Sequence, residues 1–188
     1  MSTTLEHDTA TSTQTVWNID PAHTDVGFAV KHLMISTVRG RFAEVNGTIR
    51  LDGGDLTRAS VEAEIATASI DTRQEQRDTH LRSADFFEVE AYPTITFRST
   101  RVERIKDNRY RITGDLTIRD VTREVVLEGT DEGRGKDPWG GERLAFSATT
   151  TIDRRDFGLT WNQALETGGV LVSTEIKITI DVQAVKAR

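Results

Sequence analysis

The chain contains no cysteine among its 188 residues. This absence excludes disulfide bonds, thiolate metal sites and cysteine nucleophiles. No stretch reaches the roughly 18 to 20 consecutive apolar residues that a transmembrane helix needs, so no transmembrane segment is expected. The sequence also lacks an excess of basic residues, because 24 Lys and Arg are spread among 30 Asp and Glu for a formal net charge of -6. A general nucleic-acid binder needs a concentrated basic surface, so no nucleic-acid partner is expected.

Residues 1–15 lack the features of a secretory signal, which joins basic residues to a following apolar run. They read MSTTLEHDTATSTQT and contain one large aliphatic residue, Leu5, after Met1. They also lack the apolar periodicity and the turn residues of the rest of the chain. We therefore expect a disordered polar tail over residues 1–15, one folded domain over residues 16–188, and a cytoplasmic location.

Helical periodicity is nearly absent, and from Trp17 onward apolar residues recur with a period of two. This period is typical of strands with one buried and one exposed face. The alternation is clearest at residues 26–30, 110–118 and 176–182, and weaker strand signals lie at residues 38–51, 60–70, 94–105, 123–129 and 144–152. About eight strands joined by short turns predict an all-β fold that closes into an antiparallel eight-stranded barrel, since closure removes exposed strand edges.

One short helix is predicted in the only long connection, at about residues 73–83. Thr72 and Glu75 have the spacing of a capping box, and Asp78 and Arg82 have the i,i+4 spacing of a favourable ion pair. Leu81 is the only sizeable apolar residue of this helix. We therefore expect the helix to lie on the surface or the rim of the barrel.

Four sequence motifs are spread over nearly the whole chain. Residues 17–32 read WNIDPAHTDVGFAVKH, residues 80–87 read HLRSADFF with Tyr92, Pro93 and Phe97 beyond, residues 114–118 read GDLTI, and residues 155–158 read RDFG. Together they resemble the YceI family of lipocalin-like proteins. The resemblance implies a lipocalin-like eight-stranded barrel whose apolar interior holds a polyisoprenoid or another long-chain amphiphile, with no cofactor, metal or catalytic centre. Many members of that family are exported.

The size of the inward-facing residues decides whether such a barrel is hollow, because eight strands leave room for packed side chains or for one small ligand. From the residues alone, a packed core and a hollow interior stay equally open. Alternation and the resemblance together give nine candidate ligand-binding residues: Phe28, Val30, Phe42, Phe86, Phe87, Phe97, Leu116, Ile118 and Phe146. Phe86 and Phe87, which lie in the long connection, are expected near the mouth of the barrel. Large apolar groups in a surface connection need cover, so we expect residues 71–92 to close one end of the barrel.

Three functions are open at this point. The first is non-catalytic binding, storage or transport of an apolar long-chain ligand, such as a polyisoprenoid, an isoprenoid quinone or a fatty-acid-like amphiphile. The second is a small-molecule isomerase or hydrolase that uses His80, His23 or His32 as a base. The third is an interaction protein with a filled barrel that acts as a homodimer. The first is favoured, because the histidine spacing suits no metal site and no nucleophile is recognisable beside these residues.

One exposed aromatic residue is expected outside the barrel interior. Trp139 follows Pro138 in a Gly-rich stretch, residues 133–141, that predicts a hairpin loop. Exposed apolar groups mark contacts with partners or with membranes. Trp139 is therefore a candidate contact residue.

Overall fold

The computed structural model describes residues 13–188, and residues 1–12 of the expected tail lie outside that range. The first strand begins at Gln14, so Gln14 and Thr15 belong to the sheet and not to the tail. Thr15 pairs with Leu51, and its hydroxyl accepts a hydrogen bond of 3.1 Å from Trp17 Nε1. These contacts explain why a polar pair without an apolar period is nevertheless part of the barrel.

The described residues form a long series of strands and one α-helix. The strands are β1 (Gln14–Ile19), β2 (Asp25–His32), β3 (Ser36–Phe42), β4 (Val45–Asp52), β5 (Asp55–Ala66), β6 (Ile70–Asp71), β7 (Thr94–Lys106), β8 (Arg109–Ile118), β9 (Val121–Lys136), β10 (Glu142–Asp153) and β11 (Val172–Lys186). The helix is α1 (Glu75–Arg82), and short 3-10 helices lie at Pro21–His23, Thr67–Ser69 and Arg154–Phe157. Within residues 13–188 no helix is long and apolar enough to cross a membrane.

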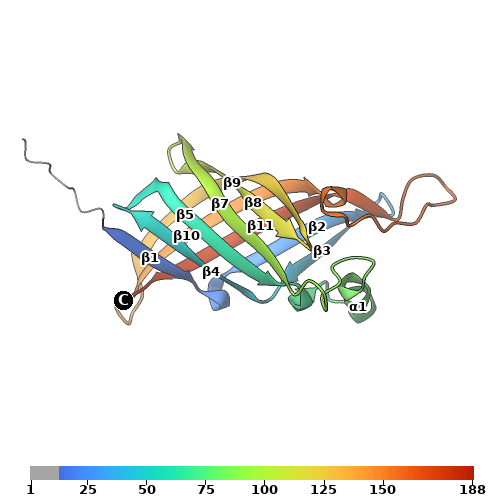
Figure 1. Ribbon diagram of the computed structural model, residues 1–188, viewed down its shortest axis with the longest axis horizontal. Coiled ribbons are helices and arrows are strands. Elements are labelled where there is room, and N and C mark those ends of the chain that lie inside the picture. Colours follow the sequence, from blue (N-terminus) through green and yellow to red (C-terminus); the bar gives the residue numbers. More distant parts are fainter. Residues whose placement is uncertain (1–12) are drawn as a thin grey trace, which may run out of the picture.

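The sheet closes into an antiparallel barrel (Figure 1). The ring of eight strands runs β1-β4-β5-β7-β8-β9-β10-β11, and β1 pairs again with β11 through Trp17 and Lys186. Strand β2 continues β1 along the same partner β11, and β3 pairs with β2 before the chain bends into β4. The prediction of a closed, eight-stranded, lipocalin-like barrel is confirmed. The single strand expected over residues 38–51 is wrong, since the bend at Ala43 and Glu44 divides it.

Strand β9 is longer than the sequence indicated, because residues 133–136 pair with β10 instead of forming a loop. The connection is a tight turn over residues 137–141. The Asp137 carboxylate holds this turn by accepting hydrogen bonds from the backbone N–H groups of Trp139 and Gly141, at 3.0 and 2.8 Å. Trp139 is 84% exposed in this turn.

The helix lies in the predicted connection, but its start differs from the prediction. Gln74 caps α1, and Thr72 does not, because Arg73 between them has a left-handed backbone with φ 62°. The expected Asp78–Arg82 pair is also wrong. Asp78 is buried and accepts hydrogen bonds from the backbone N–H and hydroxyl of Thr72, at 2.9 and 2.5 Å. Arg82 instead donates to carbonyl oxygens of residues 68 and 70, which fixes the helix to the sheet.

The two ends of the barrel are closed differently. At one end, which we call the packed end, inward side chains fill the interior: Trp17, Ile49, Leu51, Leu144 and Ala184. At the other end, residues 36–40 of β3 pair with β2 on one side and with no other described strand on the other side. Residues 72–92, which we call the lid segment, lie at that end and include α1 (Figure 1). The C-terminal end of the lid segment is fixed to the 3-10 helix before β6, because the Thr67 hydroxyl donates to the Tyr92 carbonyl at 2.7 Å.

The turn between β2 and β3 has an unusual sequence for its backbone. Leu33 and Met34 have φ angles of 53° and 62°, and Ile35 N–H donates to the His32 carbonyl at 3.2 Å. This is the geometry of a type I′ turn, in which Asn-Gly is the preferred pair. A left-handed conformation costs a non-glycine residue about 1–2 kcal/mol. We call residues 33–35 the apolar turn.

Candidate functional site

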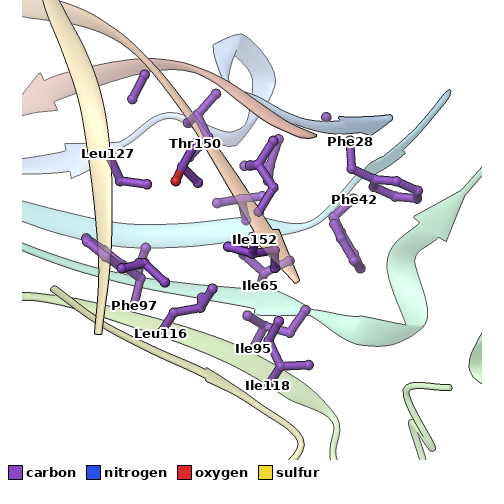
Figure 2. Close-up of a pocket in the computed structure, with 18 of the residues that line it drawn as sticks. Phe28, Phe42, Ile65, Ile95, Phe97, Leu116, Ile118, Leu127, Thr150 and Ile152 are labelled. Carbon is purple, nitrogen blue, oxygen red and sulfur yellow. The ribbon is translucent and has the colours of Figure 1, made fainter. Parts of the chain in front are cut away.

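A cavity of about 270 Å³ lies inside the barrel between the packed end and the lid segment. Every strand contributes at least one side chain to its wall, and Leu81, Phe86 and Phe87 of the lid segment complete it. Figure 2 shows side chains from opposite walls facing the same space, with Ile95, Phe97, Leu116 and Ile118 on one side and Thr150 and Ile152 on the other. The alternation of the strands therefore produces a hollow interior, and the fully packed barrel is wrong.

The nine residues expected from the sequence all lie on this wall. Phe28 and Val30 come from β2, Phe42 from β3, Phe97 from β7, Leu116 and Ile118 from β8, Phe146 from β10, and Phe86 and Phe87 from the lid segment. The Phe28 and Phe42 rings lie beside each other, with centroids 5.8 Å apart (Figure 2). Contact of these residues with a ligand stays a prediction.

Sequence reasoning missed much of the wall, including all the lining residues of β4, β5, β9 and β11. The β11 face, to which Ile176, Ile178 and Ile180 belong, is one example. Their alternation already predicted an inward orientation, so the signal was available. Leu81 in α1 and Leu159 in the connection after β10 were also missed. Neither belongs to a strand, so no period of two identifies them.

Three phenylalanines of the wall lie against glycines of neighbouring strands. A Cβ added to Gly40, Gly114 or Gly129 would stand 2.4–2.6 Å from an atom of Phe28, Phe97 or Phe146, respectively. Each ring therefore occupies the space that a side chain on the adjacent strand would take. We call these three positions the glycine seats. They let large aromatic rings lie along the wall, which helps to keep the centre of the barrel open.

The wall has almost no polar group that is free to contact a ligand. Apart from the glycine of residue 27, its only non-hydrophobic members are Thr150 and Arg154. The Thr150 hydroxyl donates to the Val126 carbonyl at 2.8 Å. A ligand in this cavity therefore meets a wall that is almost entirely apolar.

Arg154 is buried, and no carboxylate of the described residues forms an ion pair with it. Its guanidinium donates instead to the carbonyl oxygens of residues 159, 161, 172 and 173, at 2.6 to 3.3 Å. Burial lowers the pKa of this guanidinium from its ordinary value. These four bonds hold the connection between β10 and β11 against the end of β11, so Arg154 acts as a structural tie.

Aromatic contacts hold the lid segment in place. The His80 ring packs edge-on against Trp161 and Phe86, with centroids 4.6 and 5.1 Å away. His80 Nε2 also lies 2.8 Å from an Asp85 carboxylate oxygen. On the inner side, the Phe87 ring meets the Phe42 ring edge-on at 5.7 Å. The lid segment is thus attached both to β3 and to the connection that contains Trp161.

None of the histidines proposed as catalytic bases lines the cavity: His23, His32 and His80 are all absent from its wall. His23 is exposed in a 3-10 helix and lies 2.9 Å from an Asp20 carboxylate oxygen, and His32 ends β2. Residues 13–188 contain no group of three or more side chains arranged to bind a metal ion.

Comparison with known proteins places the fold and its cavity in a family. The model of the YceI-like domain matches residues 17–184. The chain belongs to the YceI family. A UPF0312 protein of Staphylococcus epidermidis is 40% identical over 166 residues, which cover 87% of this chain and 93% of that relative. The resemblance found in the sequence motifs is confirmed.

Solved structures with the YceI fold share the architecture. The Campylobacter jejuni YceI protein superimposes with a TM-score of 0.73 at 35% identity, over 90% of this chain and 96% of that chain. A polyisoprenoid binding domain from Saccharophagus degradans superimposes with a TM-score of 0.67 at 14% identity, over 91% and 98% of the two chains. The second likeness shows a common fold.

The YceI-like motifs have identifiable structural roles. The HLRSADFF motif forms the C-terminal half of α1 and the turn that places Phe86 and Phe87 on the cavity wall. The RDFG motif ends a 3-10 helix, where Gly158 has φ 78° and Phe157 is 1% exposed. Both motifs therefore build the lid end of the barrel.

Proposed function

We propose that this YceI-family protein binds an apolar long-chain ligand inside the barrel and stores or transports it without chemical change. The observation that carries the proposal is the continuous apolar wall, whose polar side chains, Thr150 and Arg154, are already hydrogen-bonded to backbone carbonyls. Such a wall favours hydrocarbon chains, because a buried polar group without a partner is costly. Polyisoprenoids, isoprenoid quinones and fatty-acid-like amphiphiles all have a chain of this kind.

The family relationship supports the same function. The YceI-like domain covers nearly the whole chain, and a structural neighbour is described as a polyisoprenoid binding domain. We extend that ligand class to this chain because its cavity has the matching chemistry. A homodimer stays a prediction.

The orientation of the ligand follows from the two barrel ends. The packed end is filled by Trp17 and Leu51, which are 3% and 0% exposed. A polar head group would find no partner there. We therefore propose that the end of the ligand's hydrocarbon chain points toward the packed end and that its head group lies at the lid segment.

The test is extraction of full-length protein purified without detergent, followed by mass spectrometry of the organic phase. A variant, Ala148→Phe, places a ring in the cavity, since Ala148 lines it in the middle of β10. Thr149→Phe is the matched control, because the next residue of the strand is exposed on the outer face. We expect the wild type and Thr149→Phe to release the same apolar compound and Ala148→Phe to release much less while remaining folded by circular dichroism.

Two results would contradict the proposal. One is an organic phase from wild-type protein with no apolar compound and no binding of added polyprenol or fatty acid. The other is equal ligand content in a folded Ala148→Phe variant. A second filling variant, Val30→Phe, keeps the test decisive if Ala148→Phe does not fold, since Val30 lines the cavity from a different strand.

A further inference from the structure

The apolar turn between β2 and β3 presents three consecutive large hydrophobic residues to solvent. Leu33, Met34 and Ile35 are 38%, 57% and 82% exposed. The other exposed large hydrophobic residues of the described chain, Ile105, Val126 and Trp139, lie singly on other strands and turns. Scattered exposed hydrophobic residues need no explanation, whereas a contiguous group marks an interaction site.

The backbone conformation of this turn is unfavourable for the large apolar residues that occupy it. Leu33 and Met34 both have the left-handed backbone that normally favours Asn and Gly. Large side chains here oppose the stability of the turn and gain no burial within the barrel. A residue held in an unfavourable conformation is a reason to look for function at that position.

The turn is continuous with the lid end of the cavity. Val30 and Val172 line the cavity, and His32, which pairs with Val172, directly precedes the turn. Leu33 N–H donates to the Leu171 carbonyl at 2.8 Å, which fixes the turn beside the connection that leads into β11. The β2–β3 turn and α1 lie at the same end of the barrel (Figure 1). An apolar surface at this end is therefore next to the place where a lipid would leave or reach the cavity.

Basic residues follow the apolar turn on the outer face of the same strands. Lys177, Ala29 and Arg39 are opposite one another across β11, β2 and β3, and Lys31 lies two residues closer to the turn. Lys31, Arg39 and Lys177 are exposed, and none forms an ion pair with another described residue. Glu175 lies on the same outer face of β11, two residues from Lys177, so the three basic residues have one acidic neighbour on that strand. This row is locally positive in a chain whose formal net charge is -6.

We propose that the apolar turn docks this protein on the surface of a lipid bilayer that contains anionic lipids. The side chains of residues 33–35 enter the boundary between head groups and acyl chains, and Lys31, Arg39 and Lys177 contact the anionic head groups. The lid end of the cavity then faces the membrane. The proposal does not depend on ligand binding, because the protein itself is measured on the vesicles.

The experiment is flotation of full-length protein with vesicles of phosphatidylcholine and phosphatidylglycerol, compared with phosphatidylcholine alone. The test variant combines Leu33→Asn, Met34→Gly and Ile35→Thr, which restores the preferred turn sequence. We expect its vesicle partition coefficient to fall by about ten-fold or more, while its melting temperature stays equal or rises. The matched control is Trp139→Ser, an exposed apolar residue in the β9–β10 turn. This variant should bind vesicles like the wild type, because Arg143 holds that turn near the packed end, away from the apolar turn.

The basic row is tested separately with Lys31→Gln and Arg39→Gln together. We expect this variant to lose binding to anionic vesicles and the dependence of that binding on salt. Absence of wild-type binding to anionic vesicles, unchanged binding of the triple turn variant, or loss of binding only in Trp139→Ser would each overturn the proposal. A wild-type dimer that becomes monomeric in the turn variant, without vesicle binding by either, would assign the turn to a second copy of the chain instead.

Discussion

The packed end and the lid end of the barrel bound the same cavity with different parts of the chain. At the packed end the closing residues are carried by paired strands: Trp17 by β1, Leu51 by β4 and Ala184 by β11. At the lid end they are carried by a segment outside the sheet, with Phe87 as its inward contact. Opening the packed end requires breaking the sheet, whereas the lid segment contains no strand and can move without breaking any strand pairing.

Ionic contacts reinforce this difference. Near the packed end Arg143 bridges Asp20 and Asp137, at 2.8 and 3.1 Å. The hydrogen bond from Arg143 lowers the pKa of Asp20 below its ordinary value. At the lid end Arg119 forms an ion pair with Glu88, at 2.7 Å. The lid segment is therefore attached at a few points, and the packed end is fixed along whole strands.

The largest effect is expected from Trp17→Ala at the packed end. Trp17 is 3% exposed among residues that cannot move without disturbing three strands. We expect a loss of about 3–5 kcal/mol in the free energy of unfolding, measured by chemical denaturation, as for large aromatic residues in packed cores. Ligand release from the molecules that remain folded should be unchanged. Faster release with little loss of stability would show that both ends open.

A smaller loss of stability, with a clear effect on ligand release, is expected from Phe87→Ala. Its ring is half-buried and contacts Phe42 at the edge of the cavity, so the neighbouring groups can relax after truncation. We expect a loss below the ~3 kcal/mol lower limit of packed-core Phe→Ala variants, together with faster release of a fluorescent fatty acid. Trp17→Ala is the control for release. Core-sized destabilisation with unchanged release would mean that the lid segment is a fixed plug.

The smallest effect is expected from His80→Gln. Glutamine keeps a hydrogen-bond donor near Asp85 but removes the ring that packs on Trp161. The expected loss is roughly 0.5–1.5 kcal/mol, the size of one aromatic ring contact, with ligand binding retained. A folded, ligand-binding His80→Gln variant that lost a measurable turnover would establish the enzyme hypothesis in place of the binding function.

The strands and the inward face of the barrel follow from the sequence, because a period of two determines which side chains share a face. Residues 176–182 show this most clearly. The start of α1 could not be predicted in this way, since the left-handed Arg73 separates Thr72 from the helix that its spacing suggested it would cap. Turn lengths were also uncertain, because glycines at 133 and 135 are typical of loops and yet lie in a strand here.

The hollow interior could not be predicted from the strands taken one at a time. Large residues such as Phe97 and Phe146 suggest a filled barrel when they are counted on their own strands. Their rings fit along the wall because glycines occupy positions on the adjacent strands, at residues 114 and 129. That pairing becomes visible only with the sheet register, which the sequence does not specify directly.

The glycine seats suggest how the width of such a barrel changes during evolution. A single change from glycine to alanine at residue 40 or 129 would bring a Cβ within 2.4 Å of a ring atom of Phe28 or Phe146, so that ring would have to leave its place on the wall. The opposite change, from alanine to glycine, makes room for a ring to lie against the wall and so widens the barrel interior. Ligand girth can therefore vary stepwise, one seat at a time, while the strand order and the closures at the two ends stay the same. The three seats lie on different strand pairs, β2–β3, β7–β8 and β9–β10, so a protein engineer can change each one separately.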